Sequence, residues 1–254
     1  MTTALFYYIN EKDSFLGYKL TSILKQQNKP DELFVLDTTG DESIASLCQQ
    51  LQTQAVFQIE HLQLPEETTF GSHLNYAAAQ SKADYMIVID RHSILHPKCI
   101  QHHVKKSKRG LFLSGTCSYF SKVKALHQAA DFNAFSKLIR KSGSAFYFPL
   151  SASLSAVKSQ IDSNSLTTNI SFWREDFNLV NGYDEDFKNQ QFASLDLLQR
   201  FLNLGIQFKK LKGAAFAYQS NELVKDSKSS SDEKKFQKSY DKKRIVAVNG
   251  LDKY

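Results

Sequence analysis

Apolar residues switch between strand-like and helix-like spacing along the first ninety positions. Three short apolar runs predict buried strands, at Ala4 to Ile9, Leu33 to Leu36 and Tyr85 to Ile89, and Val56 to Ile59 predicts a weaker one. Apolar residues at helical spacing lie between them, with Ser14 and Ser72 as expected caps and Pro30 as a stop: Leu16, Leu20, Ile23 and Leu24; Ile44, Leu47, Cys48 and Leu51; Leu74, Ala77 and Ala78. This alternation predicts parallel strands joined by crossover helices.

The pattern is weaker after His96 and Pro97. A strand is expected at Leu111 to Gly115, whereas the stretch from 121 to 164 gives little signal. Apolar residues from Leu195 to Leu202 predict a helix that ends at Gly205, and Ile206 to Phe208 and Ala214 to Tyr218 predict closing strands. The sequence therefore predicts an α/β fold with a mixed, mostly parallel sheet flanked by helices.

One domain is expected over residues 1–221, followed by a different segment over 222–254. From Glu222 to Asp241 the composition shifts to Lys, Ser and Asp, with a serine run at 229–231, which predicts a mobile linker. The terminus from Arg244 to Tyr254 is moderately apolar again. This return of apolar residues favours a tail that docks back on the domain.

Composition excludes several classes of protein. The 254 residues are 42% hydrophobic, and no run approaches the roughly 20 apolar residues of a spanning helix. The N-terminus reads as a first strand and not as a signal peptide, so a cytoplasmic location is expected. Three cysteines without CxxC spacing argue against a disulfide framework or a closed zinc site. The net charge of +6 suits any polyanion, but acids are interspersed with the basic residues and no nucleic-acid motif is present, so we expect no nucleic acid partner.

Polar residues end three of the predicted strands. Asn10, Asp37 and Asp90 each follow an apolar run, and in an open α/β sheet ligands bind beyond the carboxyl ends of the strands. The three side chains could converge on one crevice that binds a nucleotide base, a ribose and a metal-bound diphosphate. The alternative for Asn10 and Asp37 is that they open turns and cap helices.

Several motifs together resemble family 2 glycosyltransferases, which have the Rossmann-like GT-A fold. In the first half they are Phe6 to Asn10, Lys29 to Asp37, Asn75 to Ala79, Asp90-Arg91-His92 and His96-Pro97. Thr168 to Arg174 and Val180 to Phe187 are similar to the acceptor-side segment of that family. The similarity extends from the first strand to about Tyr218, and it depends on the order of many weak motifs.

The resemblance implies a nucleotide-sugar site. Asp90 and His92 would hold Mn²⁺ or Mg²⁺ against the donor diphosphate, with an Asp-x-His pattern in place of the usual Asp-x-Asp. Asn10, Asp37 and Asn75 would contact the donor. Arg244 lies in a basic tail that either closes over the diphosphate or remains solvated near anionic lipid. The alternative for Arg91 and His92 is that they are ordinary surface residues.

Other positions depart from the family pattern. Thr38 stands where a second Asp is usual, and Gln219 stands where a late His often completes the metal site. The Glu-Asp pair that supplies the general base is replaced by Ala193-Ser194, neither of which can accept a proton near neutral pH. Asp184, Glu185 and Asp196 are the remaining weak candidates for the base, although Asp184 to Asp186 are expected to cap the following helix. Trp173 is expected in the core and not as a platform for an acceptor sugar.

The sequence therefore supports three hypotheses from different classes. The first is an enzyme that transfers a sugar from a nucleoside-diphosphate sugar to a glycan or lipid-linked glycan during lipopolysaccharide or surface polysaccharide synthesis, in the cytoplasm or at the periphery of the inner membrane. The second is a catalytically weakened relative that binds a nucleotide sugar or glycan as a scaffold. The third is a basic α/β module for nucleic acid.

Overall fold

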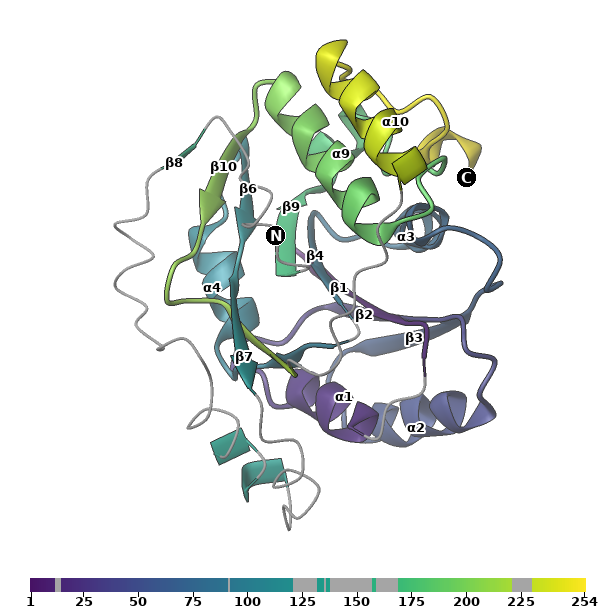
Figure 1. Ribbon diagram of the computed structural model, residues 1–254. Coiled ribbons are helices and arrows are strands. Elements are labelled where there is room, and N and C mark those ends of the chain that lie inside the picture. The colour runs from purple at the N-terminus through teal and green to yellow at the C-terminus, as the bar shows by residue number, and fades with distance from the viewer. Residues whose placement is uncertain are drawn as a thin grey trace.

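A computed structural model of the chain shows an α/β/α arrangement, with helices on both faces of a twisted sheet (Figure 1). The structure describes residues 1–11, 15–90, 92–120, 132–134, 136–137, 157–158, 169–220 and 230–254. Ser14, Arg91, Thr168 and residues 222–229 of the expected linker lie outside these ranges.

The larger described sheet has eight strands in the order β3-β2-β1-β4-β9-β6-β10-β8. Their bounds are β1 Thr3–Ile9, β2 Glu32–Asp37, β3 Gln58–Gln63, β4 Tyr85–Ile89, β6 Leu111–Ser114, β8 Val157–Lys158, β9 Asn169–Trp173 and β10 Gln207–Lys210. Strands β1, β2, β3 and β4 are parallel to one another, while β9 runs antiparallel to both β4 and β6. The expected mixed, mostly parallel sheet is confirmed.

A second described sheet of three strands joins β5 (Ile94–Leu95), β11 (Phe216–Ser220) and β7 (Thr116–Phe120) in the order β5-β11-β7. Strand β11 is antiparallel to β5 and parallel to β7. Because β5 begins only a few residues after β4 ends, this small sheet brings β11 close to the carboxyl end of β4.

The strand residues alternate between two cores. Leu5, Tyr7 and Ile9 of β1 join one buried cluster, and Ala4, Phe6 and Tyr8 join the other. The first cluster includes residues of α1 (Leu16–Leu24), α2 (Glu42–Gln52) and α4 (Cys99–Lys106), and the second those of α3 (Phe70–Gln80), α8 (Arg174–Leu179) and α9 (Gln190–Asn203). Both faces of β1 are therefore buried, as the unbroken apolar runs of a parallel sheet require.

Most predicted elements of the first half are confirmed, with shifts at their ends. The third strand begins at Gln58 and extends to Gln63, beyond the expected Val56 to Ile59, and Val56 itself is 84% exposed. Helix α3 is capped by Thr69, whose hydroxyl accepts from the Ser72 amide, so Ser72 is not the cap. Gly205 follows α9 with a φ of +93°, as expected for a residue after a helix C-cap.

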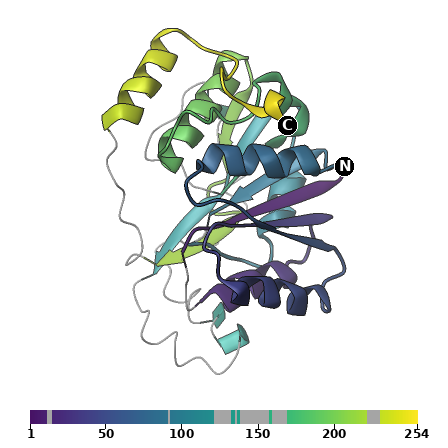
Figure 2. The ribbon, with the colours of Figure 1, turned by 90° about the vertical axis from the view of Figure 1, so that its right-hand side faces the viewer.

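The C-terminal segment differs from the expected linker. Residues Ser230–Asp241 form a helix, α10, which packs on α9, and a short 3-10 helix, η2 (Leu251–Lys253), contacts α3 (Figure 2). The composition suggested a mobile chain because Lys and Ser dominate it. Burial of Asp232 and Ser239 and packing of Phe236 stabilise the helix instead. Further along, the Ala247 amide donates to the Val180 carbonyl at 3.0 Å, and Leu251 packs against the second core cluster.

Candidate functional site

The sheet places three predicted site residues at adjacent strand ends. Asn10 follows β1, Asp37 ends β2 and Asp90 follows β4, and β1 lies between β2 and β4. The chain leaves β1 toward β2 and β3 and then returns to the other side of β1 as β4, so the strand order reverses between β1 and β4. This point is where ligands bind in open α/β sheets.

Asp90 is the most tightly held of these residues. The Gln219 amide donates from Nε2 to both Asp90 carboxylate oxygens, at 2.9 and 3.0 Å. The Ser93 hydroxyl donates to Oδ1 at 2.8 Å, and the His92 backbone amide donates to the same oxygen at 3.1 Å. Asp90 and Gln219 are 8% and 6% exposed, so the cluster lies at the edge of the solvent-accessible surface.

The small sheet explains how Gln219 reaches Asp90 from 129 positions away in the sequence. Tyr218 of β11 lies opposite Ile94 of β5, so Gln219 lies beside Ser93, just before β5. Cys117 of the neighbouring β7 is close enough that burial and the charge of Asp90 together raise the pKa of its thiol to about 12. Gln219, which stands where a late His is often found in the family, therefore lies at the predicted metal site.

Contacts also cross the point where the strand order reverses. His92, which follows β4, has its Nδ1 3.9 Å from Oε1 of Glu11, which follows β1. The Tyr7 hydroxyl of β1 donates to the carbonyl of Ser93 at 3.4 Å. Sequence reasoning missed Glu11 and Ser93. Their positions immediately after the polar ends of β1 and β4 were the only signal that could have found them.

Asp37 holds the turn after β2. Its Oδ1 accepts from the backbone amide and hydroxyl of Thr39, both at 2.8 Å, and Oδ2 lies 3.0 Å from Nε2 of His61 on β3. The cap of α2 is Asp41, whose side chain accepts from the Ser43 amide. Asp37 therefore opens a turn, one of the two alternatives, but does not cap the helix.

The side chain of Asn75 bonds to the acidic turn, and its predicted contact with the donor stays a prediction. Its Nδ2 donates to the Tyr183 carbonyl and to Glu185 Oε1, both at 2.9 Å, and its Oδ1 accepts from the Tyr183 amide at 2.8 Å. These bonds use both sides of a fully buried amide to hold the turn around Gly182. A β-carbon on Gly182 would lie 2.4 Å from Asn75 Oδ1, so only glycine fits there.

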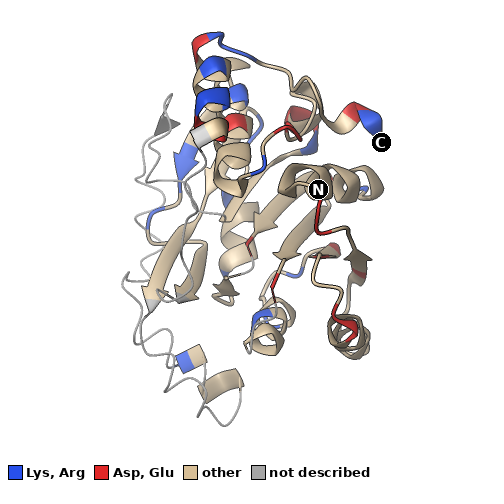
Figure 3. Cartoon of the chain, turned by 45° about the vertical axis from the view of Figure 1, so that its right-hand side comes forward, with Lys and Arg blue, Asp and Glu red and all other residues tan. Residues whose placement is uncertain are grey.

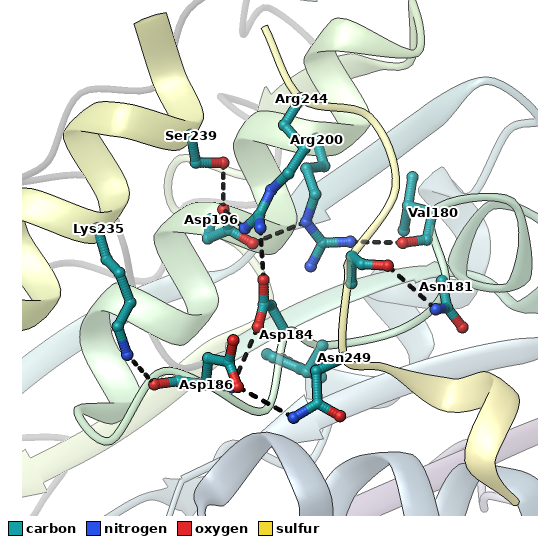
Figure 4. A network of polar contacts seen from close by, with 12 residues as sticks. Val180, Asn181, Asp184, Asp186, Asp196, Arg200, Lys235, Ser239, Arg244 and Asn249 are labelled. Carbon is teal, nitrogen blue, oxygen red and sulfur yellow. Dashed lines mark hydrogen bonds and ion pairs between the residues drawn. The ribbon is translucent and has the colours of Figure 1, made fainter. Parts of the chain in front are cut away.

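The predicted base candidates and Arg244 form a separate ion-pair network in the helical layer (Figure 4). Arg244 lies 2.7 Å from Asp184 Oδ2 and 2.8 Å from Asp196 Oδ1. Asp196 also accepts from Arg200 Nε and from the Ser239 hydroxyl, both at 2.7 Å. Burial alone would lower the pKa of Arg244, but the two carboxylates outweigh it and raise that pKa. Arg244 therefore anchors the C-terminal segment, and its predicted contact with a diphosphate stays a prediction.

We expected the acidic turn to cap α9, but it does not. The cap is Asn189, whose Oδ1 accepts from the amides of Gln191 and Phe192. Asp184 is 1% exposed, and burial is the main reason that its pKa is raised. Glu185 accepts from Asn75 and from Lys253, and Asp196 is fully buried. These contacts bury Asp184 and Asp196 in the protein interior and leave Glu185 partly exposed, and a role as general base stays a prediction for all three.

A cavity lies at the opposite end of β4, lined by Asp84, Arg109, Arg174, Glu175, Asn178 and Leu179. The guanidinium of the lining residue Arg109 lies 3.9 Å from the ring centre of Trp173, and the Trp173 ring is edge-on to Tyr85. Trp173 is 9% exposed and belongs to the core, as expected. The cavity lies at the amino end of the strand, so it is distinct from the crevice at the carboxyl ends.

The residues at the strand ends could hold a divalent ion, but they would supply only a few of its ligands. Among the described residues no cluster of three His, Cys, Asp or Glu side chains could hold a metal. Asp90 and His92 offer one carboxylate and one imidazole, and Mg²⁺ or Mn²⁺ commonly binds through one or two protein ligands, substrate phosphates and water. The Gln219 amide, which now donates to Asp90, would have to release that carboxylate.

The strand order reverses between β1 and β4, polar residues lie at those strand ends, and the antiparallel strand β9 lies beside β4. Together these features define a glycosyltransferase fold of the GT-A class. Residues 7–162, more than half of the chain, match the family model described as Glycosyl transferase family 2. The chain therefore belongs to glycosyltransferase family 2.

Solved structures share this fold. Staphylococcus aureus TarS matches with a TM-score of 0.65 at 10% identity over 100% of this chain and 41% of that chain. A shorter form of TarS in complex with UDP has the same score and identity, with 68% of that chain covered. The mannosyltransferase PcManGT from Pyrobaculum calidifontis, in complex with GDP-Man and Mn²⁺, has a TM-score of 0.57 at 12% identity over 85% of this chain and 56% of that chain. A search of curated protein sequences found no match.

Proposed function

We propose that the chain transfers a sugar from a nucleoside-diphosphate sugar to a glycan or lipid-linked glycan in the synthesis of a surface polysaccharide or lipopolysaccharide. The observation that carries this proposal is the group of Asn10, Asp37 and Asp90 at adjacent strand ends, where the strand order reverses. In this proposal Asn10 and Asp37 contact the nucleoside. Family membership and solved relatives with UDP or GDP-Man bound support the donor class.

We assign the donor diphosphate to the region of Asp90 and His92. A divalent ion bound there would neutralise the phosphates and the leaving nucleotide, and Mn²⁺ in the PcManGT complex supports this choice of ion. The role of this chain is to hold Asp90 in one orientation through Ser93 and the His92 amide. Gln219 then competes with the ion for the same two carboxylate oxygens.

A second function is a binding protein that holds a nucleotide sugar or glycan without turnover. It is favoured by Ala193-Ser194 in place of a carboxylate pair and by the burial of Asp184 and Asp196 in ion pairs. General-base assistance contributes roughly 10² to 10⁴-fold to such reactions. A chain without a base would bind the donor and transfer it slowly or not at all.

The location of the reaction is proposed to be cytoplasmic, at the periphery of the inner membrane where a lipid-linked acceptor would lie. No helix in the described part of the chain is long and apolar enough to cross a membrane. Contact with the membrane would then depend on the protein surface.

Hydrolysis of a panel of UDP-sugars and GDP-sugars, with Mn²⁺ or with EDTA, tests the enzyme against the binding protein. If the chain is an enzyme, we expect it to release nucleotide from one donor. This release should be lost in EDTA and in an Asp90→Ala variant. If the chain is a binding protein, we expect nucleotide to raise its melting temperature, but we expect no release of nucleotide above background. Neither release nor a rise in melting temperature with any nucleotide would contradict both functions.

A further inference from the structure

The segment after α10 presents aliphatic side chains to solvent. Ile245, Val246 and Val248 are 38%, 49% and 78% exposed, while Ala247 between them is 4% exposed. Single exposed apolar residues are common on protein surfaces, but three within four positions form a concentrated apolar surface. We call these three residues the aliphatic tip.

The backbone of this segment is fixed to the domain on both sides of the tip. The Ala247 amide donates to the Val180 carbonyl at 3.0 Å, and the Asn181 side chain donates to the Ala247 carbonyl at 3.1 Å. The Arg244 carbonyl accepts from Asn203 at 2.7 Å, while its guanidinium is held by Asp184 and Asp196. The aliphatic tip is therefore held outward by a docked backbone.

Basic residues flank the tip. Lys242 and Lys243 immediately precede it, and Lys234 and Lys238 are exposed on α10. Figure 3 shows Lys and Arg gathered on this helix and on the segment that follows it. Residues 230–254 contain seven Lys or Arg against four Asp or Glu, of which Glu233 and Asp241 are exposed on the same helix. The excess of positive charge remains on the outer side.

We propose that this surface docks on an anionic membrane, with the aliphatic tip entering the boundary between headgroups and acyl chains and the lysines facing lipid phosphates. Apolar side chains next to Lys and Arg on an otherwise polar surface bind anionic bilayers through burial and electrostatic attraction together. A protein partner would equally cover aliphatic residues, but the lysine excess favours a surface of uniform negative charge. The docking surface involves none of the residues at the strand ends, so it rests on the proposed membrane location and not on binding of the donor.

Vesicle sedimentation tests the proposal, with phosphatidylcholine vesicles compared with vesicles that also contain phosphatidylglycerol. The full chain is expected to bind the anionic vesicles, to release as salt rises, and to ignore neutral ones. Val246→Ser with Val248→Ser should weaken binding at least tenfold, and so should Lys242→Glu with Lys243→Glu, since each juxtamembrane Lys contributes substantially. If the double valine variant is unstable, Val248→Ser alone serves, because that side chain is the most exposed of the three.

Matched controls carry the same substitutions elsewhere. Val56→Ser changes a valine that is 84% exposed before β3, and Lys105→Glu with Lys108→Glu changes two exposed lysines around the end of α4. Both controls should bind vesicles like the parent, and every variant should keep the parent's melting temperature and its response to nucleotide. Absence of vesicle binding, equal binding to neutral vesicles, or equal weakening by the control substitutions would overturn the proposal. Failure of nucleotide binding would leave it intact.

Discussion

At the residue scale, the hydrogen bonds from Gln219 to Asp90 are the contacts that bear most on the proposed metal site. A side-chain amide that donates to both carboxylate oxygens stabilises the charge of Asp90, and it also places N–H groups where a cation would bind. An imidazole at this position would instead offer a lone pair to the cation. In the proposed metal site, the affinity for the ion would therefore depend on Gln219 of β11 as well as on the acidic motif after β4.

Gln219→His should raise the affinity for Mn²⁺ in the presence of UDP by about tenfold, because a competing donor is replaced by a ligand. Titration of Mn²⁺ followed by electron paramagnetic resonance measures the change. Gln49→His, at an exposed position on α2, is the matched control and should bind like the parent. Unchanged affinity in Gln219→His would show that Asp90 does not hold the ion.

A second residue-scale feature is the buried His103 of α4. Its Nε2 lies 2.8 Å from Asn169 Oδ1 and its Nδ1 lies 2.7 Å from the Ser171 hydroxyl, which is 2.7 Å from the Tyr85 hydroxyl. Asn169 Oδ1 can only accept, so Nε2 carries the proton and Nδ1 accepts from Ser171. The network satisfies neutral His103, and burial lowers the pKa of this imidazole to about 4.

The folded protein should therefore lose stability in acid through His103. In the unfolded chain His103 binds a proton near the ordinary pKa of 6.5, whereas in the folded chain it does so only near pH 4. The contribution of neutral His103 to the free energy of unfolding is therefore fully present above pH 6.5 and decreases as the pH falls from 6.5 to 4. The loss from this group is about 2 kcal/mol between pH 7 and pH 5. Urea unfolding at both pH values measures it, and a His103→Gln variant should show a smaller loss. Identical pH dependence in the two proteins would contradict this assignment.

At the element scale, the C-terminal segment is part of the helical layer. Arg244 joins the acidic turn to α9 through Asp184 and Asp196, and Asn181 accepts from the amide of Asp252 through its side chain and donates to the Ala247 carbonyl. Gly250 lies against this turn so closely that a β-carbon would be 2.0 Å from the Asn181 carbonyl oxygen. Local composition suggested a linker from Glu222 to Asp241 because it could not show long-range bonds such as those of Asp232 with the Asn189 amide and of Ser239 with Asp196.

Arg244→Ala should lower the free energy of unfolding by about 2 to 4 kcal/mol, because it leaves two buried carboxylates with fewer partners. The exposed neighbour Lys242→Ala should change it by less than about 0.5 kcal/mol. Urea unfolding measures both. The rise in melting temperature with nucleotide should remain in Arg244→Ala, and its specific loss would return Arg244 to the donor site.

At the scale of the whole molecule, the sequence predicted the layered architecture well because the unbroken apolar run from Tyr85 to Ile89 and the helical periodicity around Ile44 reflect burial directly. It placed Asn10, Asp37 and Asp90 at strand ends for the same reason. It could not show the internal partners of the Asn75 and Arg244 side chains, which lie 48 to 110 positions away in the sequence. Polar side chains carry no periodicity that distinguishes a ligand contact from a buried internal bond.

The central claim is that the crevice between β1 and β4 binds a nucleoside diphosphate through Asp90. Isothermal titration with UDP and with GDP, in the presence of Mn²⁺, tests it most directly on the parent, Asp90→Asn and the exposed control Glu233→Gln. We predict that one nucleotide binds the parent and the control equally, and that Asp90→Asn weakens binding at least tenfold while its melting temperature without ligand stays near that of the parent. Equal binding by the parent and Asp90→Asn would contradict the claim.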